Sequence, residues 1–233
     1  MIKLFQFAPV WGLPNASPFC MKVETYLRMA GLPYEAKTMR DPRKAPKGKL
    51  PFIVDGDETI ADSSAILEYL QTKYGDKLGD ESLSPVDRAV AHSFRILLDE
   101  HFYWAIVYSR WADDGGWEIM RPMISRGMPP IVRNIVPGII RSNVRKSLHA
   151  QGLGRHSPEE VYASGNADLT AVSSYLGDKP FMMGDEPRSI DACVYSYLAS
   201  ALHYPFASPL KLHAESLANV EPYCDRMKKR YYA

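Results

Sequence analysis

Apolar and polar residues alternate at the start of the chain, and the pattern then changes to a helical one. Residues 2–7 alternate with a period of two, which is typical of a β-strand. From Met21 to Ala30 apolar residues recur at helical spacing, until Gly31 ends the pattern. The sequence therefore predicts a strand followed by a helix, with Ser17 at the start of that helix.

A hairpin and a second helix are predicted further along. Residues 50–54 form a strand that opens at a proline, Asp55-Gly56 is a hairpin turn, and residues 58–60 form a second short strand. Asp62 is then placed to cap a helix. Together with a further strand after the first helix, these elements give the order βαβ-ββα over residues 1–75.

Beyond a polar segment rich in Gly and Ser that ends at Pro85, only helical patterns persist. We expect helices over residues 88–112, 116–126, 131–149 and 217–230, and further helix starts at Ser157 and near Ser189. Ser157 is the clearest start, because Pro158 and Glu160 complete a capping box. The sequence thus predicts an α/β domain at residues 1–75 and an all-α domain at residues 85–233.

Composition limits the possible partners. The chain of 233 residues carries 28 basic and 27 acidic residues, so its formal charge of +1 provides no general attraction to nucleic acid or to anionic membranes. Three cysteines are too few for a disulfide framework, and the six histidines show no metal-ligand spacing. With no apolar run of the ~20 residues that a membrane span needs and no signal-like start, we expect a cytoplasmic protein without a metal.

Three segments together resemble the thioredoxin-type N-terminal domain of glutathione transferases. These are Ser17-Pro18-Phe19-Cys20, Leu50-Pro51 before the hairpin, and the helix that begins at Asp62-Ser63-Ser64. The first of them, with Tyr103-Trp104 and Tyr108–Trp111, is most similar to the branch that contains failed-axon-connections proteins and metaxins. The resemblance covers nearly the whole chain. It implies the glutathione transferase architecture, glutathione as a substrate, and a homodimer.

Ser17 is the first candidate for the catalytic residue. A hydroxyl at a helix N-terminus can cap the helix and still donate to a thiolate, which the helix dipole also favours. In related transferases, a serine or cysteine at this position activates the glutathione thiol. Asn15 is the rival donor, although Pro14-Asn15 is also ordinary turn chemistry. Cys20 is better explained as a small core residue than as a nucleophile. Ser17 stands where a glutaredoxin-like Cys-Pro-Phe-Cys motif has its first cysteine, so the two-cysteine route of disulfide exchange is lost.

The resemblance also implies a set of glutathione-binding residues. The Leu50 main chain would pair with the cysteinyl residue at a cis Pro51, and Asp62 and Ser63 would hold the γ-glutamyl group. Lys49, and less directly Lys37 or Arg40, would meet the glycyl carboxylate. Each of these residues also has a simpler explanation. Pro51 could be a trans proline that opens a strand, Asp62 and Ser63 could be a plain helix cap, and the lysines could be solvated surface residues.

Aromatic residues are candidates for an acceptor pocket. Trp104, Tyr108 and Trp111 recur at i, i+4 and i+7 on one helical face, and Trp11 precedes Ser17 in a loop. Such a stripe serves equally well as a pocket wall or as plain packing.

A basic stretch without acids runs through residues 121–155. Solvated surface, a cleft that attracts anionic acceptors and an interfacial membrane contact are the alternatives. We predict that it borders the acceptor pocket and favours anionic electrophiles. Its basic residues are seven in number: Arg121, Arg126, Arg133, Arg141, Arg145, Lys146 and Arg155.

One helix start departs from the family pattern, because Arg188 stands where a capping Ser or Thr is expected, three residues before Asp191. Either Ser189 caps one residue later or this helix start is weakened.

The function that these features favour is attack of glutathione thiolate on an apolar electrophile, with Ser17 as thiolate stabiliser. The alternatives are a non-catalytic adaptor or membrane-associated binding protein with the same fold and, less favoured, a thiol-disulfide reductase.

Overall fold

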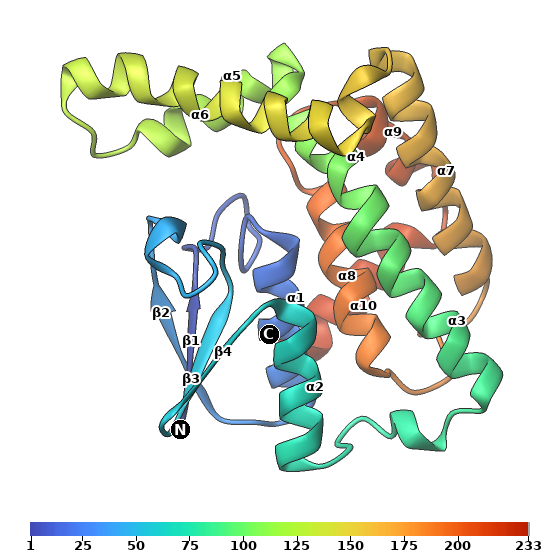
Figure 1. The fold of residues 1–233 in the computed structure, drawn as a ribbon. Coiled ribbons are helices and arrows are strands. Elements are labelled where there is room, and N and C mark those ends of the chain that lie inside the picture. Colours follow the sequence, from blue (N-terminus) through green and yellow to red (C-terminus); the bar gives the residue numbers. More distant parts are fainter. Residues whose placement is uncertain (233) are drawn as a thin grey trace.

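A four-stranded mixed sheet forms the centre of the N-terminal part in the computed structural model, which describes residues 1–232 (Figure 1). The strands are β1 (Ile2–Gln6), β2 (Tyr34–Thr38), β3 (Phe52–Asp55) and β4 (Glu58–Ala61). They lie in the order β2-β1-β3-β4, and only the β1–β2 pair is parallel.

Helices α1 (Pro18–Met29) and α2 (Ser63–Tyr74) cover one face of this sheet. Alternate strand residues such as Leu4 and Ile53 are fully buried there, against Leu27 of α1 and Ile66 of α2. The opposite strand face, which includes the stacked rings of Phe5 and Phe52, is covered by the connection between β2 and β3. That connection contains only the 3-10 turn η1 (Pro42–Lys44).

Every longer element after residue 84 is helical. The helices are α3 (Pro85–Ile96), α4 (Tyr103–Val107), α5 (Asp114–Ser125), α6 (Pro130–Gln151), α7 (Pro158–Leu176), α8 (Ser189–Leu202), α9 (Pro209–Ser216) and α10 (Val220–Tyr231), with the π-helical turns η3 (Leu97–Phe102) and η4 (Tyr108–Ala112) and the 3-10 turns η2 (Asp80–Ser82) and η5 (Leu153–Arg155). The predicted fold class, a thioredoxin-like α/β part of βαβ-ββα order followed by an all-α part, is confirmed.

Helix α8 joins the two parts into one body (Figure 1). It is buried on all sides, and its Ala192 belongs to the apolar core beneath the sheet. Conversely, Leu13 and Met21 of the N-terminal part belong to the core of the helical part. Helices α5 and α6, in contrast, project away from the helical part (Figure 1). Within residues 1–232, no helix has both the length and the apolar character needed to cross a membrane.

The start of α8 is capped from outside the helix. Arg188 has no acceptor atom in its side chain, so it cannot cap as Ser or Thr would. Instead, a carboxylate oxygen of Asp80 accepts from the Ser189 N–H at 3.1 Å, and the Arg188 guanidinium donates to the Leu78 carbonyl at 2.8 Å. Asp191 accepts from the Arg188 N–H at 2.9 Å. The segment between α2 and α3 therefore replaces the missing cap.

Candidate functional site

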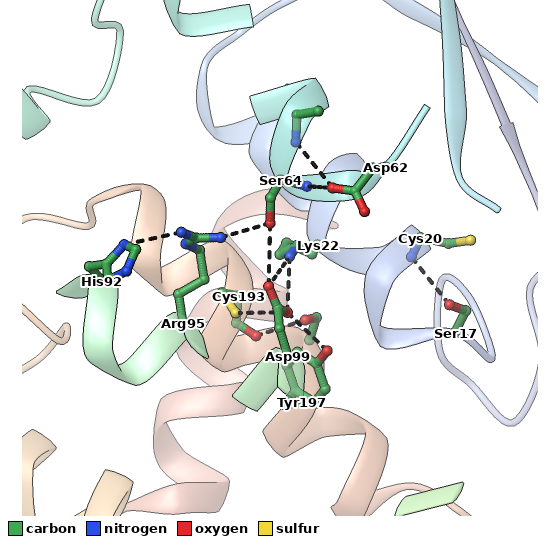
Figure 2. Close-up of polar contacts among 12 residues, drawn as sticks. Ser17, Cys20, Lys22, Asp62, Ser64, His92, Arg95, Asp99, Cys193 and Tyr197 are labelled. Atoms are coloured by element: carbon green, nitrogen blue, oxygen red, sulfur yellow. Dashed lines mark hydrogen bonds and ion pairs between the residues drawn. The ribbon is translucent and has the colours of Figure 1, made fainter. Parts of the chain in front are cut away.

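The N-terminal part provides two helix N-termini and an unpaired stretch of main chain just before β3. Ser17 lies at the start of α1, Leu50 precedes β3, and Asp62 lies at the start of α2. Unpaired N–H groups at a helix N-terminus favour an anion. Figure 2 shows Ser17 and Asp62 with the interactions that hold them.

Ser17 is the N-cap of α1, and its side chain is half-buried. Its Oγ accepts from the Cys20 N–H at 3.4 Å, a long hydrogen bond (Figure 2). Because capping uses only one lone pair, the hydroxyl proton remains available to donate. The geometry therefore allows Ser17 to cap the helix and to contact a ligand at the same time.

Asn15 occupies a different position from the one expected of a ligand donor. Its side chain is completely buried. Its Nδ2 donates to the Phe7 carbonyl at 2.7 Å, and its Oδ1 accepts from the Ser17 N–H at 3.0 Å. Asn15 thus fixes the loop that presents Ser17, and this placement favours Ser17 over Asn15 as the thiolate partner.

Cys20 is fully buried, as its interpretation as a core residue requires. Burial raises the pKa of its thiol to about 12, although the nearby Ser17 side chain and Phe7 backbone oppose this shift. The thiol therefore stays protonated at neutral pH and is a poor nucleophile.

The Leu50–Pro51 peptide bond is cis, as the family resemblance implied. Both residues are buried. Among residues 1–232, no hydrogen bond engages the Leu50 N–H or carbonyl. These two groups are therefore free to pair with an added extended peptide.

Asp62 caps α2 while keeping part of its carboxylate available. Its Oδ1 accepts from the N–H groups of Ser64 and Ala65 at 2.9 and 3.2 Å (Figure 2). Its backbone has φ of 92°, a conformation that is uncommon outside glycine. Ser63 is buried beside it. Asp62 is exposed, so its Oδ2 can receive an ammonium group.

The three candidate partners of a glycyl carboxylate lie on β2 and on the connection that follows it. Lys49 is exposed, Lys37 forms an ion pair with Glu35, and Arg40 extends towards Gly127 at the tip of the α5–α6 pair. Of the three candidates, only Lys37 has an acidic partner among the described residues, and Lys49 and Arg40 have none.

The predicted aromatic stripe is divided between two apolar clusters. Trp104 and Tyr108 pack against the main core of the helical part, whereas Trp111 packs beside Trp117 with Trp11 in a separate cluster. The π-helical turn η4 begins at Tyr108, and its wider turn changes the spacing that an α-helix would give. All four predicted pocket residues are half-buried, so each leaves part of its ring accessible.

Arg110 is a residue that the sequence did not single out. It is buried, and its guanidinium donates to the carbonyls of Ala16 and Ser200, above the rings of Trp11 and Tyr204. Burial lowers the pKa of the Arg110 guanidinium to about 10, so it remains charged at neutral pH. Arg110 therefore ties the loop before Ser17 to the helical part.

A buried ion pair adjoins the site and was also missed. Lys22 of α1 donates to both carboxylate oxygens of Asp99 at 3.0 and 2.7 Å, with both side chains at most 5% exposed (Figure 2). Asp99 also accepts from Ser64 at 3.4 Å, and Arg95 donates to Ser64 Oγ at 2.8 Å. Ser64 is next to Ser63, so this network connects the start of α2 to the helical part. The available signal was a charged residue among apolar residues in each of two helical segments.

The basic stretch lies on α5, α6 and the turn after α6. Arg141 is anchored to the main-chain carbonyls of Trp111 and Ala112 and to Asp114. The expected effect of the whole basic stretch on the choice of acceptor remains a prediction. No group of metal-ligating side chains occurs within residues 1–232.

Comparisons with known proteins give a consistent result. A model of the glutathione S-transferase N-terminal domain matches residues 18–116, and a model of the C-terminal domain matches residues 165–227. The isoprene-epoxide–glutathione S-transferase of Rhodococcus sp. (strain AD45) is 39% identical over 99% of both chains.

Two further relatives are longer proteins. Failed axon connections of Drosophila melanogaster is 35% identical, and the alignment covers all of this chain but 58% of that protein. Metaxin-1 of Homo sapiens is 30% identical, with 99% of this chain and 51% of that protein covered.

Among solved structures, a glutathione S-transferase of Ceriporiopsis subvermispora in complex with glutathione has a TM-score of 0.66 at 17% identity, covering 98% of this chain and 97% of that one. Beta-etherase LigF of Sphingobium sp. has a TM-score of 0.63 at 18% identity, covering 98% and 99%. At these identities the likeness concerns the fold alone.

Proposed function

The chain belongs to the glutathione S-transferase family, and from this premise we propose that it conjugates glutathione to a small apolar electrophile, with Ser17 as the stabiliser of the glutathione thiolate. The observation that carries the proposal is the free hydroxyl of Ser17 at the α1 N-terminus, in the same domain as the free Leu50 main chain and Asp62.

The energetics suit this role. A free thiol has a pKa of ~8.5, and one charge-assisted hydrogen bond contributes ~1.5–3 kcal/mol. At ~1.4 kcal/mol per pKa unit, the Ser17 hydroxyl would lower the thiol pKa by about one to two units. That is enough to make the thiolate abundant at neutral pH.

Glutathione binding follows the same set of residues. Leu50 would pair with the cysteinyl main chain, while Asp62 and the α2 N-terminus would hold the γ-glutamyl ammonium and carboxylate. Lys49 would meet the glycyl carboxylate. Trp11, Trp104, Tyr108 and Trp111 would supply the acceptor pocket.

An epoxide is the first acceptor to test, because the Rhodococcus relative is named for isoprene epoxide. Sulfur attack would form a C–S bond and break one ring C–O bond, and the oxygen would then take a proton from water. The buried Cys20 takes no part in this step.

The experiment is calorimetric titration with glutathione, followed by mass spectrometry of the product formed with a small alkene epoxide. Ser17→Ala serves as the matched variant. We expect binding and a conjugate, with the conjugate strongly reduced in the variant. Binding of glutathione that gives no conjugate with epoxide or chlorinated aromatic acceptors, and no glutathione disulfide and alcohol with a peroxide, would contradict catalysis.

A non-catalytic binding protein is the second candidate. It is favoured by the similarity over the whole chain to Failed axon connections and Metaxin-1, whose names state no enzyme activity. Absence of glutathione binding in the same titration would select this candidate. We also propose that the chain forms a homodimer, which sedimentation would test against the 26.3 kDa of one chain.

A further inference from the structure

Helix α6 presents a large apolar stripe to solvent. Ile131, Ile135 and Ile139 are spaced four residues apart, so they lie along one side of the helix. They are 76%, 56% and 54% exposed, while Pro137 and Leu148 on the opposite side are buried. Single exposed apolar residues need no explanation, but three in a row on a projecting helix indicate a contact surface.

The same face of α6 becomes cationic towards its C-terminal end. A shallow, open hollow lined by α6 alone lies there, next to the bare backbone of Gly138, where a side chain would meet nothing within 4 Å. Arg145 and Lys146 line it, and neither forms an ion pair with a carboxylate in residues 1–232. The other lining residues are Arg141, Ser142 and His149. The face thus has an apolar half and an anion-attracting half.

Charge in this chain is strongly segregated. Residues 119–158 hold seven Lys or Arg residues and no Asp or Glu, whereas the remaining 21 basic and 27 acidic residues leave the rest of the chain with a formal charge of −6. The overall charge of +1 conceals this division. An approaching anionic surface would be attracted by this segment, in which α6 is the longest element.

From this arrangement we infer that the exposed face of α6 docks on a lipid bilayer that contains anionic phospholipids. The three isoleucines enter the boundary between headgroups and acyl chains, and the cationic hollow receives a phosphate headgroup. A second copy of the chain is a poorer occupant. A symmetric contact would place this cationic face against itself, and the segment carries no acid to neutralise it.

The test is co-sedimentation of the full chain with vesicles of phosphatidylcholine alone or with about one third phosphatidylserine, at ~0.1 M and ~1 M salt. We expect binding to the anionic vesicles at low salt, and much weaker binding to neutral vesicles or at high salt. Arg145→Gln with Lys146→Gln should weaken binding about 25-fold, since each cation near an anionic surface contributes roughly a factor of five. Ile135→Asp with Ile139→Asp should abolish it.

The matched control is Leu212→Asp, which makes the same chemical change at a 55% exposed position on α9. It should bind vesicles as the unmodified chain does, and circular dichroism should show all variants folded. Equal binding to neutral vesicles, or an equal loss in Leu212→Asp, would overturn the inference. Binding of polyglutamate or inorganic phosphate without binding of vesicles would also overturn it. A change in the sedimentation of the free protein on Ile135→Asp would indicate self-association through this face and would overturn it as well.

Discussion

Ser17 is the side chain on which the proposed chemistry depends. Ser17→Ala removes the hydroxyl donor but leaves the α1 N-terminus and Asp62 in place. The pKa of bound glutathione should therefore rise by at least about one unit, while its affinity changes only a few-fold. Thiolate absorbance followed against pH measures this shift. An unchanged titration curve would transfer the role away from Ser17.

Buried thiols give a second prediction at the scale of single residues. Cys20, Cys193 and Cys224 are all buried, and burial raises the pKa of each thiol, that of Cys20 to about 12. At pH 7 to 8 the native chain should react with a thiol reagent far more slowly than free cysteine, and all three thiols should react after denaturation. Rapid labelling of one thiol in the folded protein, located by peptide mass spectrometry, would contradict its burial.

The start of α8 carries the prediction at the scale of elements. Asp191 is buried, and burial raises the pKa of its carboxyl to about 6, although bonds from Met182, Arg188 and Tyr223 oppose the shift. In the pH range between the ordinary value of ~3.9 and about 6, the folded state holds a proton that the unfolded state has lost. The resulting stabilisation is complete below the ordinary value and is lost as pH rises through 6.

Asp191→Asn removes this titration. The free energy of unfolding of the unmodified protein, minus that of the variant, should fall by about 2–3 kcal/mol between pH 4 and pH 7. Urea unfolding at several pH values measures this difference in the free energy of unfolding. The contributions of the other carboxyl groups are the same in both proteins and cancel. A difference that does not vary with pH would mean that Asp191 titrates as an ordinary carboxyl.

Periodicity and capping residues were sufficient to predict most elements. The capping box at Ser157 forms as expected, with both of its hydrogen bonds. The helix expected over residues 88–112 is present from Pro85, but its two π-helical turns were not predicted, because apolar spacing does not report the hydrogen-bond pattern. Helix α9 was missed because it has only eight residues. Contacts from distant segments, such as Asp80 at the α8 start, have no local signal.

The candidate site shows the same limit. Ser17, Leu50 and Asp62 were proposed because each belongs to a local motif at a helix or strand start that resembles the glutathione transferase pattern. Arg110 and the Lys22–Asp99 pair were not, since their partners lie far away in sequence. A charged residue within an apolar pattern shows that a partner is needed, but not which one.

The Lys22–Asp99 pair is the feature that acts on the whole molecule. It connects α1 of the thioredoxin-like part to η3 of the helical part, in a region where Tyr197 of α8 also donates to Asp99 at 3.0 Å. Removing one member of a buried pair leaves an uncompensated charge. Lys22→Met and Asp99→Asn should therefore each lower the free energy of unfolding by about 3–5 kcal/mol, and the double variant should lose less than the sum.

Because the two parts share apolar cores through Leu13, Met21 and Ala192, this loss should affect the molecule as a unit. Unfolding followed by tryptophan fluorescence and by far-ultraviolet circular dichroism should give one coincident transition in every variant, moved to lower urea concentration. Two separated transitions in Lys22→Met would instead show that the ion pair alone couples two independently folding parts. In that case the network from Ser64 to Asp99 would control how firmly the α2 N-terminus is held against the helical part.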